Sequence, residues 1–179
     1  IRSGKLGKIA YVDIHSYYGS PRDYPPNAPP PDHLDWETYV GPASWRDYNP
    51  GIHPRKWRAC EQFSNGQTGD LCVHFFDVVR YFLKLGWPKR IAASGGILMR
   101  APDSNINTHD TQTALFDYGD VQVVWNQRNW GRNPDPDYPW ALFIHGDKGT
   151  LKASTMRADF LYGLFQSFFS SCMAYRTRQ

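Results

Sequence analysis

The sequence has 179 residues, of which 41% are hydrophobic; this composition suits a folded domain with its own core and excludes a disordered protein. The formal net charge is only +3 and the basic residues are scattered along the chain, so we expect no binding of nucleic acid. The three cysteines form no C-x-x-C pair and no H-E-x-x-H spacing occurs, so neither a disulfide framework nor a metal site is expected.

Residues 8–18 alternate between two sets of side chains in a β-rich composition, which predicts the first strand. His15 is interpreted as a polar residue at a strand end, because no partner residues stand at a defined spacing from it. The first residue is isoleucine rather than methionine, so we expect a longer protein whose N-terminal part precedes this sequence.

Residues 19–54 form a Pro-rich insert whose PPNAPPPD segment excludes a helix or a central strand. Within it, Asp35 is expected to cap a short helix over residues 36–40, which Gly41 ends. A long excursion of this kind is either a lid or binding loop, or a rigid arm that packs against a partner subunit, and both remain open. Its tryptophans can stack on sugar rings or serve as core residues.

A cationic cluster follows the insert, where Arg55, Trp57 and Arg58 precede a Gly-rich approach. Such a cluster can hold a hydroxylated or acidic substrate. Surface charge on a loop explains the same pattern equally well.

Residues 66–86 predict a long helix, because apolar side chains dominate, turn-forming residues precede it, and Gly86 with Pro88 beyond it gives a stop signal. A helix this apolar is expected to be mostly buried against a sheet. Asp70 and His74 are four residues apart on one stripe, so a carboxylate and an imidazole can act together in proton transfer. The same spacing is also typical of a purely structural hydrogen bond.

Five further strands are predicted after the helix, over residues 89–99, 111–118, 121–129, 141–145 and 150–153. Successive hairpins indicate an α+β fold: a mainly antiparallel open sheet, a long buried helix packed on one face, and Pro-rich loop inserts. Residues 155–179 are predicted to form an amphipathic tail helix, truncated or rearranged, because its phenylalanines follow helical spacing. Its apolar stretch is short and interrupted, so no membrane span is expected.

Several stretches in the same order resemble the C-terminal domain of the Gfo/Idh/MocA oxidoreductase family, in its bacterial sugar-oxidoreductase-like branch. GDLCVHFFD, with WRACEQFSNGQT before it, resembles the catalytic-helix region, whose pattern is Asp-x-x-x-His-x-x-Asp. GKLGKIAYVDIH resembles the domain's first strand, and LDWETYVGPASWRDYNP and HPRKWR resemble its loop insert. DTQTALFDYGDVQVVWNQR and FIHGDKGTLKAS resemble its later strands, so the resemblance covers residues 1–154.

The resemblance implies the substrate-binding and oligomerisation domain of an NAD(P)-dependent sugar or polyol oxidoreductase. It implies Asp70 and His74 as catalytic residues, and Arg55, Trp57 and Arg58 on the substrate side. The sequence contains no G-x-G-x-x-G after a strand, so we expect NAD or NADP to bind a separate N-terminal dinucleotide-binding domain and not this chain alone. A homo-oligomer formed through the sheet is implied as well.

Two other functions remain open. One is a carbohydrate-acting hydrolase or lyase of the same family that uses transient oxidation with a tightly held cofactor. The other is a non-catalytic interaction module whose sheet serves only for association. Whether Asp70 and His74 face an open cleft or a sealed core discriminates a site from a module.

Overall fold

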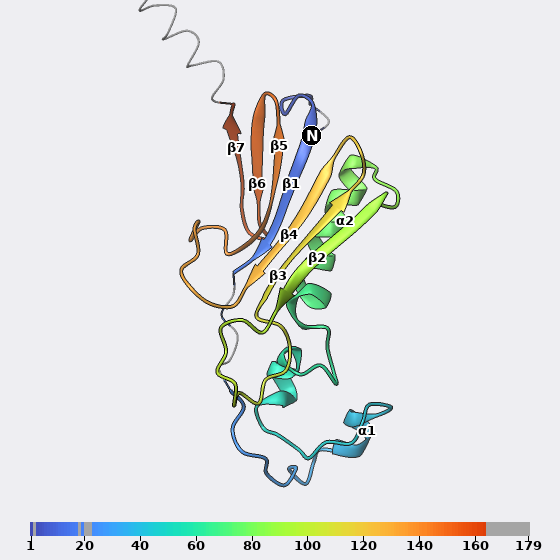
Figure 1. The fold of residues 1–179 in the computed structure, drawn as a ribbon, viewed down its shortest axis with the longest axis vertical. Coiled ribbons are helices and arrows are strands. Elements are labelled where there is room, and N and C mark those ends of the chain that lie inside the picture. Colours follow the sequence, from blue (N-terminus) through green and yellow to red (C-terminus); the bar gives the residue numbers. More distant parts are fainter. Residues whose placement is uncertain (2, 18, 20–22, 164–179) are drawn as a thin grey trace, which may run out of the picture.

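The computed structural model describes residues 1, 3–17, 19 and 23–163, and within them seven strands form one open sheet in the order β2-β3-β4-β1-β5-β6-β7 (Figure 1). The parallel pairing of β1 with β4 joins two antiparallel groups of strands. The prediction of a mainly antiparallel α+β fold is confirmed. The strands are β1 (Ile9–Ser16), β2 (Arg90–Gly96), β3 (Thr111–Asp117), β4 (Gln122–Arg128), β5 (Trp140–Gly146), β6 (Gly149–Ala153) and β7 (Ala158–Tyr162).

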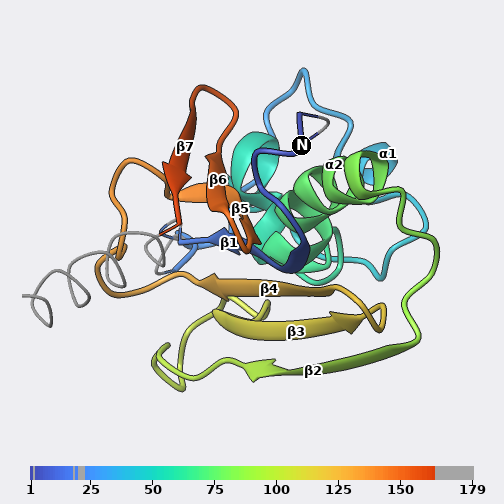
Figure 2. The ribbon, with the colours of Figure 1, turned by 90° about the horizontal axis from the view of Figure 1, so that it is seen from above.

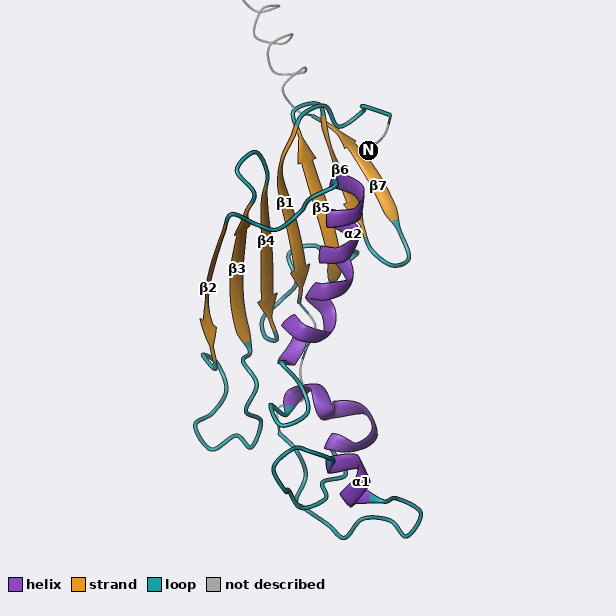
Figure 3. Ribbon diagram, turned by 90° about the vertical axis from the view of Figure 1, so that its right-hand side faces the viewer, coloured by secondary structure: helices purple, strands orange, loops and turns teal. Residues whose placement is uncertain are grey.

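The helix α2 (Val73–Leu83) lies against one face of this sheet, which we call the inner face (Figures 2 and 3). Strand register brings the core together, because Ile14 of β1 stands opposite both Trp125 of β4 and Leu142 of β5. These three side chains are at most 2% exposed and pack with Phe75 and Val79 of α2. This sheet core therefore depends on residues far apart in the sequence.

The predicted long, mostly buried helix over residues 66–86 is not confirmed in its length or its burial. A π-helical turn, η3 (Thr68–Cys72), precedes α2, and only two residues of α2 itself are buried. Its solvent side carries apolar residues instead, with Tyr81 at 70% and Phe82 at 48% exposure. The apolar composition led us to expect more burial than the structure shows. A single helix on one face of a sheet buries only the side that contacts the sheet.

The helix also ends earlier than the predicted stop at Gly86. Lys84 adopts the left-handed conformation at φ 54° and its N–H donates to the carbonyl of Arg80. Leu85 donates to the same carbonyl at 3.0 Å and packs against the sheet core. A hydrophobic contact just beyond the cap is typical of such helix ends, so burial of Leu85 fixes the end at a residue that is not glycine.

Between β1 and η3 the chain leaves the sheet as an arm over residues 23–67, seen at the bottom of Figure 1. The predicted short helix is confirmed as α1 (Trp36–Val40): Asp35 accepts from the Thr38 N–H at 2.9 Å, and Gly41 ends it with φ 55°. Two further helical turns, η1 (Ile52–Lys56) and η2 (Trp57–Ala59), bring the chain back toward the sheet.

The arm has its own small hydrophobic core, which we call the arm core. It contains the following buried residues: Tyr24, Trp36, Val40, Tyr48, Ile52, Ala59, Cys60 and Ile106. The buried Trp36 is thus a core residue, whereas Trp45 is 65% exposed. Ile106 comes from the loop between β2 and β3, so this loop ties the arm to the sheet.

Two further predictions from the sequence concern His15 and the tail of the chain. His15 is near the end of β1 as expected, but it is buried, and its ring nitrogens contact Asp13 Oδ2 at 3.0 Å and the Tyr138 carbonyl at 2.9 Å. In the tail, residues 158–162 form strand β7 on β6, where a helix was predicted. The remaining tail residues, 164–179, lie outside the described part of the chain.

Candidate functional site

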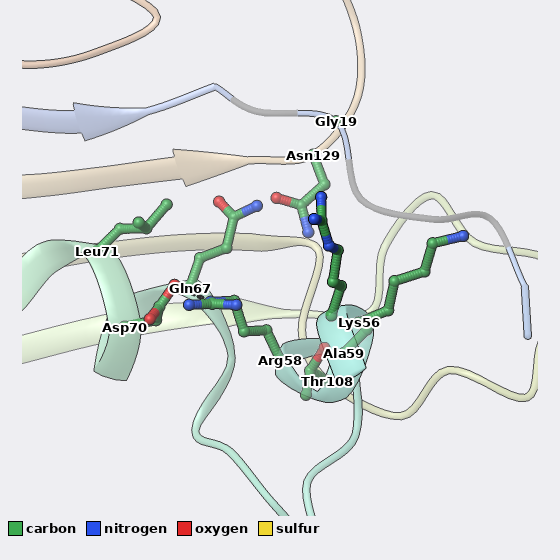
Figure 4. A pocket seen from close by; sticks show the side chains of 10 residues that line it. Gly19, Lys56, Arg58, Ala59, Gln67, Asp70, Leu71, Thr108 and Asn129 are labelled. Atoms are coloured by element: carbon green, nitrogen blue, oxygen red, sulfur yellow. Dashed lines mark hydrogen bonds and ion pairs between the residues drawn. The ribbon is translucent and has the colours of Figure 1, made fainter. Parts of the chain in front are cut away.

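A hollow of about 360 Å³ lies where the arm, η3 and one end of the sheet meet (Figure 4). The strands β1 and β4 are parallel, so their C-terminal ends reach this place together, and the loops after them form part of its wall. The lining residues are Gly19, Arg55, Lys56, Arg58, Ala59, Gln67, Asp70, Leu71, Thr108 and Asn129. Three of the five predicted site residues, Arg55, Arg58 and Asp70, are therefore brought to one pocket.

Asp70 comes from η3 and is paired with Arg58. The Arg58 Nε donates to Asp70 Oδ2, and Figure 4 shows the two side chains pointing toward each other. The guanidinium of Arg58 lies 4.3 Å from the ring centre of Trp57, the fourth predicted residue, which is partly buried beside the pocket. The Asp70 side chain keeps 15% exposure, so its carboxylate faces the hollow and is not sealed in the core.

His74, the fifth predicted residue, lies one turn further along and does not line this pocket. It is exposed, and its ring centre is 5.8 Å from that of Trp140 in an edge-on contact. Within the described residues no hydrogen bond joins Asp70 to His74. The spacing argument assumed regular α-helix, whereas Asp70 lies in a π-helical turn, whose wider winding changes the angle between residues four apart.

A partly buried hydrogen-bond network beside the pocket holds η3 in place. Thr68 Oγ1 accepts a hydrogen bond from Trp125 Nε1 at 3.0 Å and contacts His109 Nε2 at 3.2 Å. Its single hydroxyl hydrogen can be donated either to Gln112 or to Gln127, whose Oε1 is at 3.2 Å. This connects the start of the helical segment to both β3 and β4, so the position of Asp70 is set by the sheet.

Three polar lining residues, Gln67, Thr108 and Asn129, were not found from the sequence. Gln67 Oε1 accepts from Ser16 Oγ at 3.1 Å at the end of β1, and Thr108 is buried. Asn129 follows β4 directly, and its side chain accepts from Gln127 Nε2 at 3.4 Å. Asn129 directly follows β4, Thr108 lies shortly before β3 and Gln67 directly precedes η3, and these positions become informative only once the strand order is known.

The pocket's cationic side is built on a well-anchored turn. Ile52 of η1 is fully buried in the arm core, and the Tyr24 hydroxyl donates to the Lys56 carbonyl at 2.6 Å. Burial raises the pKa of Tyr24 well above its usual range, mainly through desolvation of the phenolate, so this hydroxyl stays a donor. Arg55 and Lys56 themselves are exposed and, among the described residues, form no ion pair.

A second hollow of about 620 Å³ adjoins the first, since Gly19 and Asn129 line both. It contains Arg100, whose pKa is lowered by burial although Asp110 and Asp23 work in the opposite direction. Burial works to raise the pKa of Asp110. Hydrogen bonds from the N–H groups of residues 98–100 and the Thr111 hydroxyl outweigh this and leave that pKa lowered.

Among the residues that the structure describes, no group of three or more His, Cys, Asp or Glu side chains is arranged to hold a metal ion. No helix in the described part of the chain combines the length and apolarity that a membrane crossing requires. The helical segment beside the pocket starts with side chains bonded to the sheet and follows no glycine fingerprint, so these residues do not fit a dinucleotide pyrophosphate.

Comparison with known proteins gives one family match. The model of the GFO/IDH/MocA C-terminal domain matches residues 42–152, which is more than half of the chain. No curated protein matches the chain. The matched range contains Asp70, His74, Arg55, Trp57 and Arg58.

Solved structures with a similar fold come from larger proteins. The chain is similar to an NAD-binding oxidoreductase from Klebsiella pneumoniae (TM-score 0.54, 19% identity, 90% of this chain and 38% of that chain). It is also similar to an inositol dehydrogenase homologue from Azotobacter vinelandii complexed with NADH and myo-inositol (0.54, 16%, 91% and 35%). A third is the WlbA dehydrogenase from Bordetella pertussis in complex with NADH and UDP-GlcNAcA (0.52, 18%, 90% and 38%). The chain thus spans well under half the length of these proteins.

Proposed function

The chain belongs to the Gfo/Idh/MocA oxidoreductase family, as a C-terminal domain, and from this premise we propose that it is the substrate-binding half of an NAD(P)-dependent sugar or polyol oxidoreductase. The carrying observation is that the family match includes Asp70, whose carboxylate lines an open hollow among groups that donate and accept hydrogen bonds. Two structures of similar fold were solved with NADH together with a sugar nucleotide or a polyol, which favours the same class of substrate.

The division of labour follows from what the pocket contains. The nicotinamide, when bound, supplies the hydride acceptor or donor. Gln67, Thr108 and Asn129 orient the substrate hydroxyls in the hollow. Asp70, held by Arg58, accepts a hydrogen bond from the substrate hydroxyl near the reacting carbon.

We assign the proton of the reacting hydroxyl to His74. Its ring is exposed one turn beyond Asp70, outside the lining of the hollow, and contacts the edge of Trp140. In this arrangement His74 takes up the proton as the hydroxyl is oxidised and returns it in the reverse direction. Arg55 and Arg58 form the substrate side of the pocket, and Trp57 lies beside it against Arg58.

Two partners belong to this proposal. The first is a dinucleotide-binding domain of the whole protein, because the sequence contains no G-x-G-x-x-G after a strand; titration of the chain alone with NADH should give no saturable binding. The second is another copy of the protein, bound through the face of the sheet opposite α2. On that outer face Asp13 stands opposite Val124 and Phe143, and all three remain partly exposed. Sedimentation of the full-length protein as a monomer would contradict the second partner.

The proposed roles are tested in a full-length version by following NADH absorbance with a panel of sugars and polyols. We expect His74→Ala to lower kcat by about 100-fold or more, the usual contribution of general acid–base catalysis. Asp70→Asn should lower kcat similarly, whereas Asp77→Asn on the exposed side of α2 serves as the matched control and should change little. Full turnover in His74→Ala would remove this residue from the mechanism, and release of products from glycosides without net NADH formation would indicate a hydrolase or lyase instead.

A further inference from the structure

The two adjoining hollows differ in their balance of charge. The first is lined by three cationic side chains, Arg55, Lys56 and Arg58, against one carboxylate, Asp70. Arg58 and Asp70 neutralise each other through their ion pair, which leaves two positive charges without a counterion among the described residues. In the second hollow Arg100 has both Asp110 and Asp23 as electrostatic partners, so the carboxylates there outnumber the cation.

The unpaired cations are fixed in position at their backbone. Ile52, four residues before Lys56, is fully buried, and Ala59, three residues after it, is 4% exposed. The Lys56 carbonyl is bound by the Tyr24 hydroxyl at 2.6 Å, so the turn that carries Arg55 and Lys56 is held from both sides. A concave site whose two positive charges are carried on an anchored turn attracts an anion more strongly than a mobile surface loop does.

The rest of the wall is uncharged and polar. Gln67 and Asn129 present side-chain amides to the hollow, and Figure 4 shows both on the wall between Asp70 and Gly19. Amides suit hydroxyl groups, whereas an arginine fork suits the oxygens of a carboxylate or phosphate. The ligand that matches both parts has hydroxyls at one end and a negative charge at the other.

We propose that the substrate of this pocket is an anionic sugar, a hydroxylated ring bearing a carboxylate or a phosphate group that Arg55 and Lys56 bind. This proposal rests on the proposed function, which requires only a sugar or polyol, and adds the charge. The charge of Asp70 is neutralised by its pairing with Arg58, so one pocket can hold a negative group and a hydroxyl near Asp70 without strong repulsion.

The test uses the 179-residue chain and four probes: D-glucuronate, a hexose phosphate, D-glucose and inorganic phosphate. Binding is followed by NMR through the side-chain amides of Gln67 and Asn129. We expect at least one anionic sugar to bind about 10- to 100-fold more tightly than D-glucose, the size of one charged hydrogen bond. Added salt should weaken the binding of the anionic sugar and leave the binding of D-glucose unchanged. Comparing the affinities for D-glucuronate and for the hexose phosphate shows whether a carboxylate or a phosphate is preferred.

Substitutions assign the effect to the two cations. The double variant Arg55→Gln with Lys56→Gln should bind the anionic sugar no more tightly than it binds D-glucose. The matched double variant Arg132→Gln with Lys148→Gln removes two exposed cations outside the first pocket's lining and should leave the affinity unchanged. Far-UV circular dichroism checks that both variants remain folded.

The outcomes separate the two proposals. Equal affinity for D-glucose and the anionic sugars, or no loss in the Arg55/Lys56 variant, overturns the anionic substrate and leaves the sugar oxidoreductase standing. Binding of inorganic phosphate as tight as that of the hexose phosphate overturns recognition of the sugar ring, and with it the proposed function. If none of the probes shifts Gln67 or Asn129, both proposals fail.

Discussion

The sheet core and the arm core reach the same degree of burial by different means. In the sheet core, aliphatic side chains such as Val12, Ile14 and Val123 lie on alternating positions of neighbouring strands and are 0% exposed. The arm core uses aromatic side chains whose polar atoms are bonded to backbone carbonyls: Trp36 Nε1 to Arg46 at 2.7 Å and Tyr24 Oη to Lys56 at 2.6 Å.

This difference shows how the two walls of the pocket are stabilised. A Pro-rich segment lacks a ladder of backbone hydrogen bonds, so buried Trp and Tyr must bind its carbonyls one by one. Asp70 and Asn129 lie on segments that pack on or follow the sheet, and Arg55 and Lys56 lie on the turn that is anchored in the arm core. The pocket therefore exists only while both cores are intact, and the following experiments ask how independent they are.

The largest effect is expected for Trp125→Ala in the sheet core. Trp125 is fully buried and its indole N–H bonds Thr68, so the substitution leaves both a large cavity and a lost anchor for η3. We expect a loss of about 3–5 kcal/mol in the free energy of unfolding. Urea unfolding followed by far-UV circular dichroism measures it, with Trp87→Ala, 86% exposed, as the control that should change little.

Trp36→Ala should destabilise the arm core and leave the sheet core folded. Its indole is 4% exposed and belongs to the arm core, which has few other buried residues to compensate. We expect the arm to open locally, so that hydrogen exchange accelerates over residues 23–67 while β1, β4 and β5 remain protected. Trp45→Ala is the matched exposed control. A single global transition affecting both cores equally would mean that they form one cooperative unit.

A smaller effect is expected for Asp110→Asn at the junction of the two cores. The pKa of Asp110 is lowered in the folded protein, so its stabilisation is present above the unfolded-state value of about 3.9 and is lost as the pH falls through the folded value. At neutral pH the substitution should cost about 1–3 kcal/mol, because three backbone N–H groups lose their charged acceptor.

The pH dependence gives this prediction its control. The difference in unfolding free energy between the original chain and Asp110→Asn should shrink as the pH falls below 4, by the same linkage. The exposed Asp120→Asn should show no such dependence. A difference that stays constant down to low pH would show that the charge of Asp110 is not what stabilises the junction.

The opening of the two cores can also be compared without any substitution. Each core contains one free buried cysteine: Cys72 in the sheet core and Cys60 in the arm core. Burial raises the pKa of the Cys72 thiol to about 12, so the folded protein keeps it protonated and unreactive. If the arm opens more readily, brief alkylation followed by peptide mapping should label Cys60 before Cys72. Equal rates would argue that the two cores open together.

Six of the seven strands could be predicted because their signals are local, whereas β7 fell where a helix was expected. Alternation over residues 8–18 and the hairpin at Gly119, whose φ of 94° suits glycine, needed no knowledge of distant residues. The Asp35 cap is equally local, since donor and acceptor are three residues apart. The helix end at Lys84 was missed because burial of Leu85 against distant strands decided it.

The site divides along the same line. The sequence by itself determined the strands β1 to β6, the capped helix of the arm, and the presence of Asp70, Arg55 and Arg58 near a helix start, because these depend on side-chain type and short spacing. Only the tertiary structure decided that Asp70 pairs with Arg58 and not with His74, and that Gln67, Thr108 and Asn129 complete the wall. Those contacts depend on the winding of η3 and on which strand ends meet, and both are settled by packing between distant segments of the chain.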